Sequence, residues 1–307
     1  MDGFKKIRVK VPATTANLGS GFDALGIALN LFNTVEMWCD ANSKTSDISA
    51  VGEGAQSLPL DAANMVAQAA AMVFERNQMQ PHGLHIRLIN EIPPARGLGS
   101  SAAARLGGLL AANALSGGLL TDSELLAIAA REEGHPDNVA AALLGGMVVC
   151  GWNKDQLVWE KISLSNTIRI VAAVPNFELP TLRSCAALPE TVRLQDAVFN
   201  LQHACLLTAA LAKGDLEKVA VYMEDKIHQP YRIPLVPGAL DVFAAAIGAG
   251  AKGVALSGSG PTIIALAVDQ EENIGLAMMK AFLQHGITCS VRYLQPVNNG
   301  ASGEWFY

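Results

Sequence analysis

The spacing of apolar positions changes along the chain, and the first part of the sequence predicts strands. Residues 7–11 alternate between apolar and charged types, which is typical of a half-buried strand, and Pro12 is expected to end it. Residues 25–40 are rich in Val, Phe and Trp and predict a second, longer extended segment. The polar stretch 41–60 predicts a loop before the first helix.

Helical spacing of apolar residues appears in several later segments. Thr121 and Glu124 have the spacing of a capping box, which predicts a helix start, and Gly134 is expected to end the same helix. We predict helices over residues 61–77, 100–115, 121–133, 191–212, 215–228, from 238 onward, and 271–285. Shorter apolar runs predict strands over 84–90, 147–152, 157–162, 168–175 and 287–295, a strand–glycine loop–strand unit over 252–268, and a Pro-broken loop over 231–237.

The order of these elements predicts the fold class. Hairpins are mixed with separated helices, which indicates an α+β fold rather than a strictly alternating parallel sheet. A length of 307 residues suits two domains, since single domains commonly span roughly 100–200 residues. We therefore predict an N-terminal domain over residues 1–160 and a C-terminal domain over 161–307.

Composition and charge exclude several classes of protein. Half of the residues are hydrophobic and 16% are charged, so a large core is available and disorder is not expected. The 22 Lys and Arg against 28 Asp and Glu give a net charge of −6, without a basic cluster, which argues against nucleic-acid binding. The five Cys lack zinc-ligand spacing, and neither a signal peptide nor a run of ~20 apolar residues is found. These features predict a cytoplasmic protein with reduced thiols and no membrane partner.

The stretch EIPPARGLGSSAA, residues 91–103, is a candidate phosphate site. It lacks the lysine of a P-loop and the spacing of a dinucleotide-binding motif. Gly97 and Gly99 nevertheless allow a phosphate to approach the backbone, and Ser100 and Ser101 add hydroxyls at a helix start with free N–H groups. The same residues also describe an ordinary Ser-capped helix, so this stretch alone leaves both interpretations open.

Two further Gly/Ser loops favour the phosphate interpretation. VPATTANLGSGFDALGIAL at 11–29 and ALSGSGPTIIAL at 255–266 both join apolar segments, and GHPDN at 134–138 lies between them. Together with residues 91–103, these stretches resemble the signature motifs of the GHMP kinases. With QPYRIPLVPG at 229–238, they are similar to the homoserine kinase branch of that superfamily, over about residues 8–267.

The resemblance implies a fold and an activity. It implies a ribosomal-S5-like N-terminal domain and a ferredoxin-like C-terminal domain. It also implies transfer of the γ-phosphoryl group of ATP, with Mg²⁺, to the side-chain hydroxyl of L-homoserine, a step of threonine biosynthesis. A homodimer is the assembly that the resemblance suggests.

The resemblance also implies roles for individual residues. Asn17, Asp23 and Thr181 would be catalytic. The substrate would be bound by Asn17, Asp23, His135, Asp137, Asn138 and Arg232. The ATP contacts would be made by Asn64, Pro93, Arg96, Gly97, Leu98, Gly99, Ser100, Ser101, Ala102, Ser257, Gly258, Ser259 and Gly260.

The chemistry of an amino-acid substrate agrees with these roles. Its ammonium group needs an anion, which Asp23 or Asp137 can supply, and its carboxylate needs a cationic fork, which Arg232 can supply. Purely structural roles remain open for several of these residues. Asp23 can form an Asx turn, His135 can cap carbonyl groups, and an Arg in a Pro-bounded loop can be a surface residue.

The pattern departs from the family at the expected metal site. A Glu is expected eleven residues before Asn138, as the acidic ligand of Mg²⁺, and this position is Ala127. Glu124 lies one helical turn before it on nearly the same face, so Ser101 and Glu124 are the candidate ligands, although the capping box competes for Glu124. Glu133 is interpreted as a solvated residue.

A second departure lies beside Thr181. The family has an Arg four residues later, which would hold the substrate carboxylate, and this position is Cys185. Two alternatives to a homoserine kinase therefore stay open. One is a GHMP kinase of another small alcohol or amino alcohol, and the other is a non-catalytic ligand-binding relative.

Overall fold

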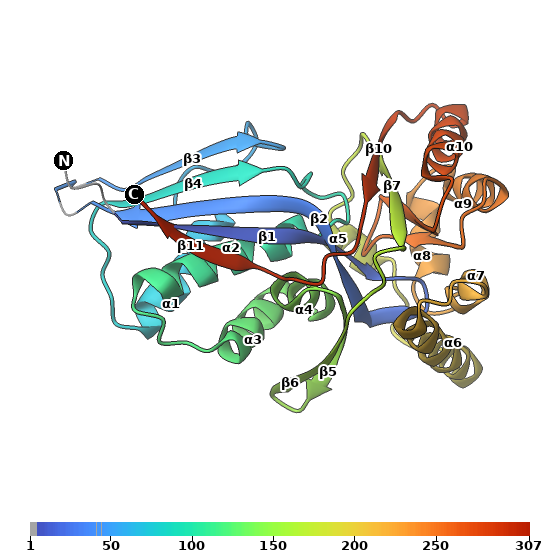
Figure 1. Cartoon of the computed structure of the whole chain (residues 1–307), viewed down its shortest axis with the longest axis horizontal. Helices are drawn as coiled ribbons and strands as arrows, with labels where there is room; N and C mark the ends of the chain where they lie inside the picture. Colours follow the sequence, from blue (N-terminus) through green and yellow to red (C-terminus); the bar gives the residue numbers. More distant parts are fainter. Residues whose placement is uncertain (1–4, 41, 44) are drawn as a thin grey trace.

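The computed structural model describes residues 5–40, 42–43 and 45–307, which form two sheets with helices around them (Figure 1). The first is seven-stranded and follows the order β11-β1-β2-β4-β3, with β5 paired to β2 and β6 paired to β5. Its strands are β1 (Lys6–Asn17), β2 (Gly21–Cys39), β3 (Asp47–Gly52), β4 (Leu84–Asn90), β5 (Met147–Asn153), β6 (Gln156–Ile162) and β11 (Ser302–Phe306). The α+β prediction is confirmed.

Four helices cover one face of the first sheet (Figure 1). They are α1 (Met65–Arg76), α2 (Ser100–Leu115), α3 (Asp122–Glu133) and α4 (Asp137–Leu144). The Ala-rich α2 packs against β1, β2 and α1, and Ala103, Leu106 and Ala111 are fully buried there. Small side chains allow this helix to lie close to the sheet, so its N-terminus is held rigidly where the site forms.

The second sheet has four antiparallel strands in the order β10-β7-β9-β8. They are β7 (Arg169–Pro175), β8 (Gly253–Leu256), β9 (Ile263–Ala267) and β10 (Cys289–Leu294). Around it lie α6 (Leu194–Lys213), α7 (Val219–Tyr222), α9 (Ala239–Gly248) and α10 (Glu271–Gln284). The strand order, in which the last strand lies beside the first, is the ferredoxin-like arrangement that the motifs implied.

Short helices lie where the two sheets approach each other (Figure 1). They are α5 (Thr181–Ala186), α8 (Gln229–Arg232) and the 3₁₀ turn η1 (Ile233–Leu235). The sequence predicted a plain loop over 231–237 and one continuous helix over 215–228, and both predictions are wrong. The predicted helix over 215–228 is interrupted because the Asp225 carboxylate accepts the backbone N–H groups of residues 227–229. These hydrogen bonds start α8 instead.

Two strand predictions in the first sheet are also corrected. β1 does not end at Pro12, because the pairing with β2 shifts between Pro12 and Ala13, and a bulge is a position where a strand tolerates proline. Residues 41–60, predicted as a loop, contain the edge strand β3, which is only six residues long and mostly exposed.

The C-terminal strand belongs to the first sheet. β11 pairs antiparallel with β1, with Lys6 opposite Phe306 and Lys10 opposite Ser302. The division into domains 1–160 and 161–307 stays a prediction. In the structure, residues 302–306 return from the second sheet to the first. Among the described residues, no single helix is long and apolar enough to cross a bilayer, and only the bent pair Gln229–Leu235 with Ala239–Gly248 passes by length and composition.

Candidate active site

A cavity of about 290 Å³ opens between the first sheet's helices and the second sheet. Residues far apart in the sequence line it, from the β1–β2 turn, the start of α2, the α3–α4 junction, α5, α8 and the β8–β9 loop. The predicted site residues that line it are Asn17, Asp23, Arg96, Gly97, Gly99, Ser100, Ser101, His135, Asp137, Asn138, Thr181, Arg232, Gly258 and Ser259.

The start of α2 forms one wall of the cavity. Gly99 precedes the helix in the left-handed conformation, with φ 71°, and makes no side-chain cap. A Cβ atom there would lie 2.0 Å from Thr14 Oγ1, and one on Gly97 would lie 2.2 Å from the carbonyl oxygen of Ser257. Both glycines are therefore required for the close packing of this loop, which leaves the first-turn N–H groups of α2 directed at the cavity.

Arg96, next to this loop, is used to join the two sheets. Its Nε donates to the carbonyl oxygen of Pro175 at 3.0 Å, at the end of β7, and its Nη1 lies 3.6 Å from the Glu178 carboxylate. The guanidinium thus anchors the loop before α2 to the end of β7 in the second sheet.

An acidic residue faces Ser101, and it is not the one that the sequence predicted. Ser101 Oγ donates to Glu133 Oε2 at 2.7 Å, and Arg105 Nε donates to the same oxygen at 2.8 Å. Glu124 lies at the other end of α3, where its exposed carboxylate accepts hydrogen bonds from the backbone N–H and the hydroxyl of Thr121, and this capping box lowers its pKa. The capping box therefore holds Glu124 at the start of α3, away from Ser101.

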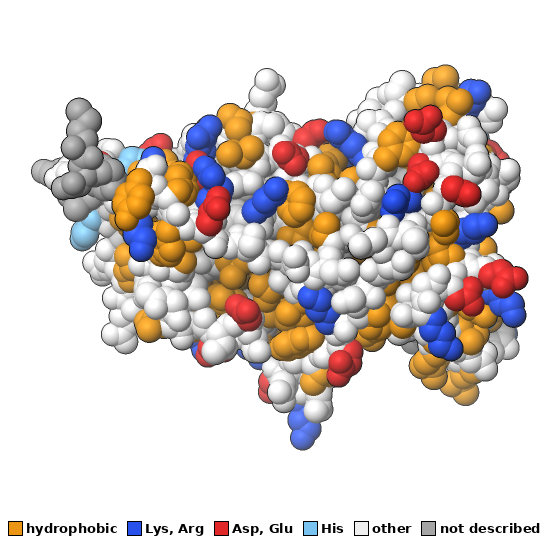
Figure 2. Space-filling model, viewed as in Figure 1, with side chains coloured by type: hydrophobic (Ala, Val, Ile, Leu, Met, Phe, Trp, Pro, Cys, Tyr) orange, Lys and Arg blue, Asp and Glu red, His pale blue; other side chains and the backbone are white. Residues whose placement is uncertain are grey.

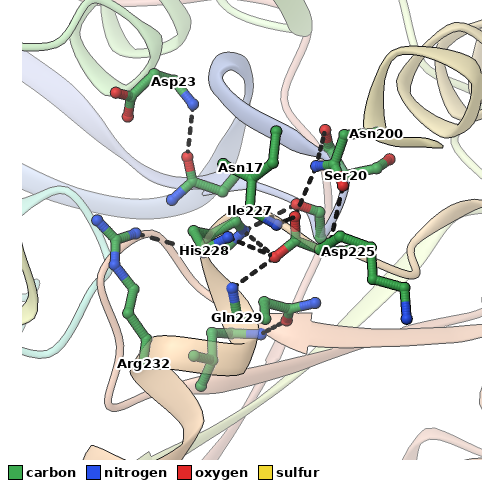
Figure 3. Close-up of polar contacts among 12 residues, drawn as sticks. Asn17, Ser20, Asp23, Asn200, Asp225, Ile227, His228, Gln229 and Arg232 are labelled. Atoms are coloured by element: carbon green, nitrogen blue, oxygen red, sulfur yellow. Dashed lines mark hydrogen bonds and ion pairs between the residues drawn. The ribbon is translucent and has the colours of Figure 1, made fainter. Parts of the chain in front are cut away.

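The β1–β2 turn places Asn17 and Asp23 in the cavity. Both have positive φ, 70° and 53°, a conformation that Asn and Asp adopt more readily than most residues. Asn17 Oδ1 accepts the backbone N–H of Asp23 at 2.9 Å (Figure 3). Asn17 Nδ2 donates to the carbonyl oxygen of Gly258 at 2.9 Å. Burial, and then the nearby charge of Asp137, raises the pKa of Asp23.

The α3–α4 junction brings a compact polar cluster to the same cavity. Asp137 Oδ1 lies 3.0 Å from His135 Nδ1 and accepts the backbone N–H of Asn138 at 2.7 Å. Asn138 Oδ1 in turn accepts the hydroxyl of Thr14 at 2.7 Å. Burial is the largest single influence on His135 and opposes its charged form, but the hydrogen bond to Asp137 and the negative charges of Asp137, Glu133 and Asp23 together raise the pKa of His135.

Arg232 approaches the cavity from α8. The side chain is 3% exposed, its Nη1 donates to the carbonyl oxygen of Gly258 at 3.4 Å, and its Nε has no partner among the described residues. Its Cζ lies 5.1 Å from the centre of the Phe22 ring. A buried guanidinium with unused donors is suited to bind an anion.

The α5 wall of the cavity is mostly apolar. Thr181 Oγ1 lies 3.4 Å from Ser259 Oγ, and Ser184 Oγ donates to the carbonyl oxygen of Ser259 at 3.0 Å, which ties α5 to the β8–β9 loop. The rest of the wall is formed by Leu179, Leu182, Cys185 and Leu188. Cys185 is exposed to the cavity where an Arg was expected.

Several predicted ATP residues do not line the cavity. Leu98 and Ala102 are fully buried in the core, and Ser257 Oγ donates to the carbonyl oxygen of Gly97. Pro93 lies in a neighbouring hollow, and Gly260 donates its backbone N–H to the carbonyl oxygen of Ser257. These residues shape the loops around the cavity rather than face it.

Asn64 lies in a second, smaller hollow that also reaches Ser100. Its Oδ1 accepts the backbone N–H of Val66 at 2.9 Å, and its Nδ2 donates to the carbonyl oxygen of Pro59 at 2.7 Å. Asn64 is therefore the N-cap of α1, and its contact to ATP stays a prediction.

Sequence reasoning missed Glu133 and Phe22, both of which line the cavity. Glu133 directly precedes GHPDN, and this neighbourhood was the available signal. Gly134, with φ 86°, ends α3 and turns the chain at once into the His135 cluster, so Glu133 lies beside the start of α2. Phe22 sits one residue before Asp23, but nothing in its type distinguishes it from a core aromatic.

Comparisons with known proteins agree with this geometry. The families described as "GHMP kinases N terminal domain" and "GHMP kinases C terminal" match residues 64–146 and 207–284. The homoserine kinase of Moorella thermoacetica is 46% identical over 293 residues, which cover 95% of this chain and 98% of that protein. That of Carboxydothermus hydrogenoformans is 44% identical, with 95% of each chain covered.

Solved structures lead to the same family. The crystal structure of homoserine kinase from Cytophaga hutchinsonii matches with a TM-score of 0.87 and 33% identity, over 97% of both chains. A D-glycero-D-manno-heptose 1-phosphate kinase from Bacteriodes thetaiotaomicron, at 18% identity and a TM-score of 0.69, shares the fold. Both GHMP kinase domains match this chain, and relatives that it covers almost completely are 44–46% identical to it. The chain therefore belongs to the GHMP kinases.

Proposed function

We propose that the protein is a homoserine kinase, which transfers the γ-phosphoryl group of ATP to the side-chain hydroxyl of L-homoserine on the route to threonine. One observation carries the proposal. A single cavity brings the N-terminus of α2 together with two carboxylates, Asp23 and Asp137, and one buried guanidinium, Arg232. A phosphate cradle and partners for both ends of a zwitterion therefore lie side by side.

In this proposal the substrate lies between α8 and the α3–α4 junction. Arg232 pairs with the carboxylate, because its buried Nε has no partner among the described residues. Asp137 pairs with the ammonium group, and Asp23 accepts a hydrogen bond from the hydroxyl that attacks the phosphorus. Phosphoryl transfer depends mainly on positioning and charge neutralisation, so Asp23 need not be a strong base.

ATP phosphates would bind at the first turn of α2, and Mg²⁺ beside them. Among the described residues no cluster of three or more His, Cys, Asp and Glu side chains is close enough to hold a metal. Glu133 and Ser101 still fit Mg²⁺, which usually takes one or two protein oxygens and completes its shell with phosphate oxygens and water. A bound Mg²⁺ would neutralise charge on the transferred group, with Glu133 as the carboxylate ligand in place of the predicted Glu124.

A second substrate class is favoured by Cys185. Because this residue replaces an Arg, the α5 wall supplies no cation for a substrate carboxylate. A small alcohol or amino alcohol with less negative charge would fit this wall better. The alternative is a GHMP kinase of such a compound.

One assay distinguishes these functions. Purified protein is mixed with ATP, Mg²⁺ and a panel of L-homoserine, L-threonine, L-serine, mevalonate and 3-aminopropan-1-ol, and ADP release is followed. Turnover of L-homoserine well above the others supports the proposal. Turnover of only another alcohol supports the alternative, and thermal stabilisation by ligands without any turnover indicates a binding protein. We also propose that this activity takes place in the cytoplasm.

We also propose that the protein is a homodimer that pairs through α6. Leu194, Val198 and Leu201 are 81%, 43% and 64% exposed, and they form one stripe with Cys205, Ala209 and Ala212. The stripe lies opposite the buried face of α6, and no charged residue interrupts the helix between Asp196 and Lys213. Figure 2 shows hydrophobic side chains gathered over α6 at the lower right.

The stripe is complementary to itself, which selects a second copy as the partner. Its large residues lie in the first half of the helix and its small ones in the second half. In an antiparallel pair about a two-fold axis near residue 203, Leu194 faces Ala212 of the partner subunit, and Leu201 faces Cys205 of the partner subunit. Such reciprocal contacts are typical of two-fold interfaces.

Sedimentation velocity and a cross-link test this dimer. Leu201→Glu is expected to give a monomer, whereas Leu119→Glu, at a leucine 66% exposed in the α2–α3 connection, should leave the dimer intact. Leu201→Cys should form a disulfide with the partner's native cysteine under oxidation, and Leu201→Cys/Cys205→Ser should not. A monomeric wild type, or a dimer indifferent to Leu201→Glu, would overturn the assignment.

A further inference from the structure

His228 is fully buried behind the substrate cavity, and its surroundings define its protonation state. Its Nε2 lies 2.8 Å from the carbonyl oxygen of Gly19, which can only accept, so Nε2 carries the proton. Burial, with a contribution from the charge of Arg232, lowers the pKa of His228 to about 4. The ring is therefore neutral at physiological pH, and its Nδ1 is an acceptor.

Nδ1 of His228 faces the guanidinium of Arg232, which would bind the substrate carboxylate. Arg232 Nη1 lies 3.5 Å from Nδ1 of His228, one helical turn away on α8 (Figure 3). The Phe22 ring stacks on the His228 ring, with centroids 5.0 Å apart, and also lies under the Arg232 guanidinium. Arg232 is thus held between an aromatic face, a neutral nitrogen acceptor and the Gly258 carbonyl, none of which carries negative charge to compete with a substrate anion.

The same imidazole also holds the β1–β2 turn. Its Nε2–H donates to Gly19, in the segment that connects Asn17 to Asp23. Asn17 in turn donates to the Gly258 carbonyl oxygen that accepts from Arg232. The His228 side chain therefore connects the Asn17–Asp23 turn, which would face the substrate hydroxyl, to Arg232, which would face the substrate carboxylate.

His228 is itself fixed by a buried carboxylate. Asp225 Oδ2 accepts the backbone N–H of His228 at 2.9 Å, and Asp225 Oδ1 accepts Asn200 Nδ2, on α6, at 2.6 Å (Figure 3). Asn200 Nδ2 also lies 3.3 Å from the carbonyl oxygen of Ser20. These bonds fix the backbone of His228, and Asp225 Oδ2 also lies 3.6 Å from its Nε2, although neither Asp225 nor Asn200 lines the cavity.

We propose that His228 is a positioning residue that holds Arg232 and the Asn17–Asp23 turn in one fixed relation, so that the substrate carboxylate and hydroxyl are bound at the correct separation. The inference rests on the proposed function. It assigns to His228 two separable tasks, since Nδ1 serves Arg232 and Nε2 serves the turn.

Two conservative variants separate these tasks. In His228→Asn the amide oxygen takes the place of Nδ1 and can still accept from Arg232, whereas in His228→Gln the amide nitrogen takes the place of Nε2 and can still donate to Gly19. The readout is the ratio of kcat/KM for L-homoserine to that for 3-aminopropan-1-ol, its analogue without the carboxylate. A loss of stability or of overall activity lowers both values and leaves the ratio unchanged.

We expect His228→Gln to lower this ratio by about 10-fold, mainly through KM for L-homoserine, since a hydrogen bond that orients a charged group is lost. His228→Asn should keep most of the ratio but lower kcat for both substrates, and KM for ATP should change in neither variant. An unchanged ratio in His228→Gln would overturn the inference.

A crystal structure of each variant keeps this test independent of the proposed function. The Arg232 guanidinium should leave the Gly258 carbonyl in His228→Gln and stay there in His228→Asn. If the wild type does not phosphorylate L-homoserine, the proposed function fails, and the position of Arg232 still decides the role of His228. An unmoved guanidinium in both variants would refute that role.

Discussion

Ser101 and Glu133, 32 positions apart in the sequence, share a hydrogen bond of 2.7 Å at the start of α2. The carboxylate also accepts from Arg105 at 2.8 Å, so its charge is balanced until a cation arrives. In the proposed metal site, the last residue of the same helix would supply the acidic residue that is missing at Ala127.

The first prediction concerns this pair. Glu133→Gln should raise the Mg²⁺ concentration needed for half-maximal activity by on the order of 100-fold. The amide keeps the shape of the side chain but loses the charge that a hard cation requires. A Mg²⁺ titration of the initial rate measures the effect. Glu124→Gln is the matched control and should behave as wild type, and the reverse result would return the metal site to the other end of α3.

The second prediction concerns Arg232. Arg232→Met should raise KM for L-homoserine by roughly 30-fold or more, since the loss of one partner of a buried charge pair costs about 2 kcal/mol at least. Steady-state kinetics with each substrate varied in turn are the measurement. KM for ATP should stay within a factor of about two, and a parallel rise in both constants would mean that the residue supports the fold of the cavity rather than the substrate.

The third prediction concerns the α5 wall. Cys185→Arg should lower KM for L-homoserine by about 2- to 5-fold, because a solvent-exposed ion pair contributes roughly up to 1 kcal/mol. Cys185→Ser, which adds no charge, should leave KM unchanged. If the arginine variant binds homoserine less tightly, the carboxylate lies elsewhere in the cavity, and the alternative substrate class gains support.

The fourth prediction concerns pH and stability. The pKa of His228 is lowered to about 4 in the folded protein, whereas an unfolded chain has the ordinary value near 6.5. Between these values the unfolded state binds more protons, so this residue makes the free energy of unfolding fall as pH falls from about 6.5 towards 4. Urea unfolding at a series of pH values should show a shallower decline for His228→Gln than for wild type. Replacing the exposed His82 with Gln should not change the slope.

The elements with strong helical periodicity were predictable from sequence, and those shaped by partners were not. The helices over 100–115, 121–133 and 271–285 are confirmed with nearly the predicted bounds, because their apolar spacing and end residues agree. β3 and β11 were missed because both are short edge strands of five or six mostly exposed residues.

The candidate site shows the same division. The Gly residues before α2 and the Ser residues in its first turn carried a local signal, since close backbone approach restricts the residue types there. The role of Glu133 depended on the left-handed Gly134 and on how α3 packs against α2, and no count along the chain contains that information. The link from His228 to Gly19 spans 209 positions and follows only from the packing of α8 against the β1–β2 turn.

The position of β11 has a consequence for how the protein is made. The outer edge of β1 is covered only when residues 302–306 arrive, and these are synthesised after all four strands of the second sheet. During translation β1 therefore lacks a partner at its outer edge while the whole ferredoxin-like part emerges and folds. A nascent chain stalled after residue 162 should accordingly be more susceptible to proteolysis, and to pairing with other chains along β1, than the finished protein.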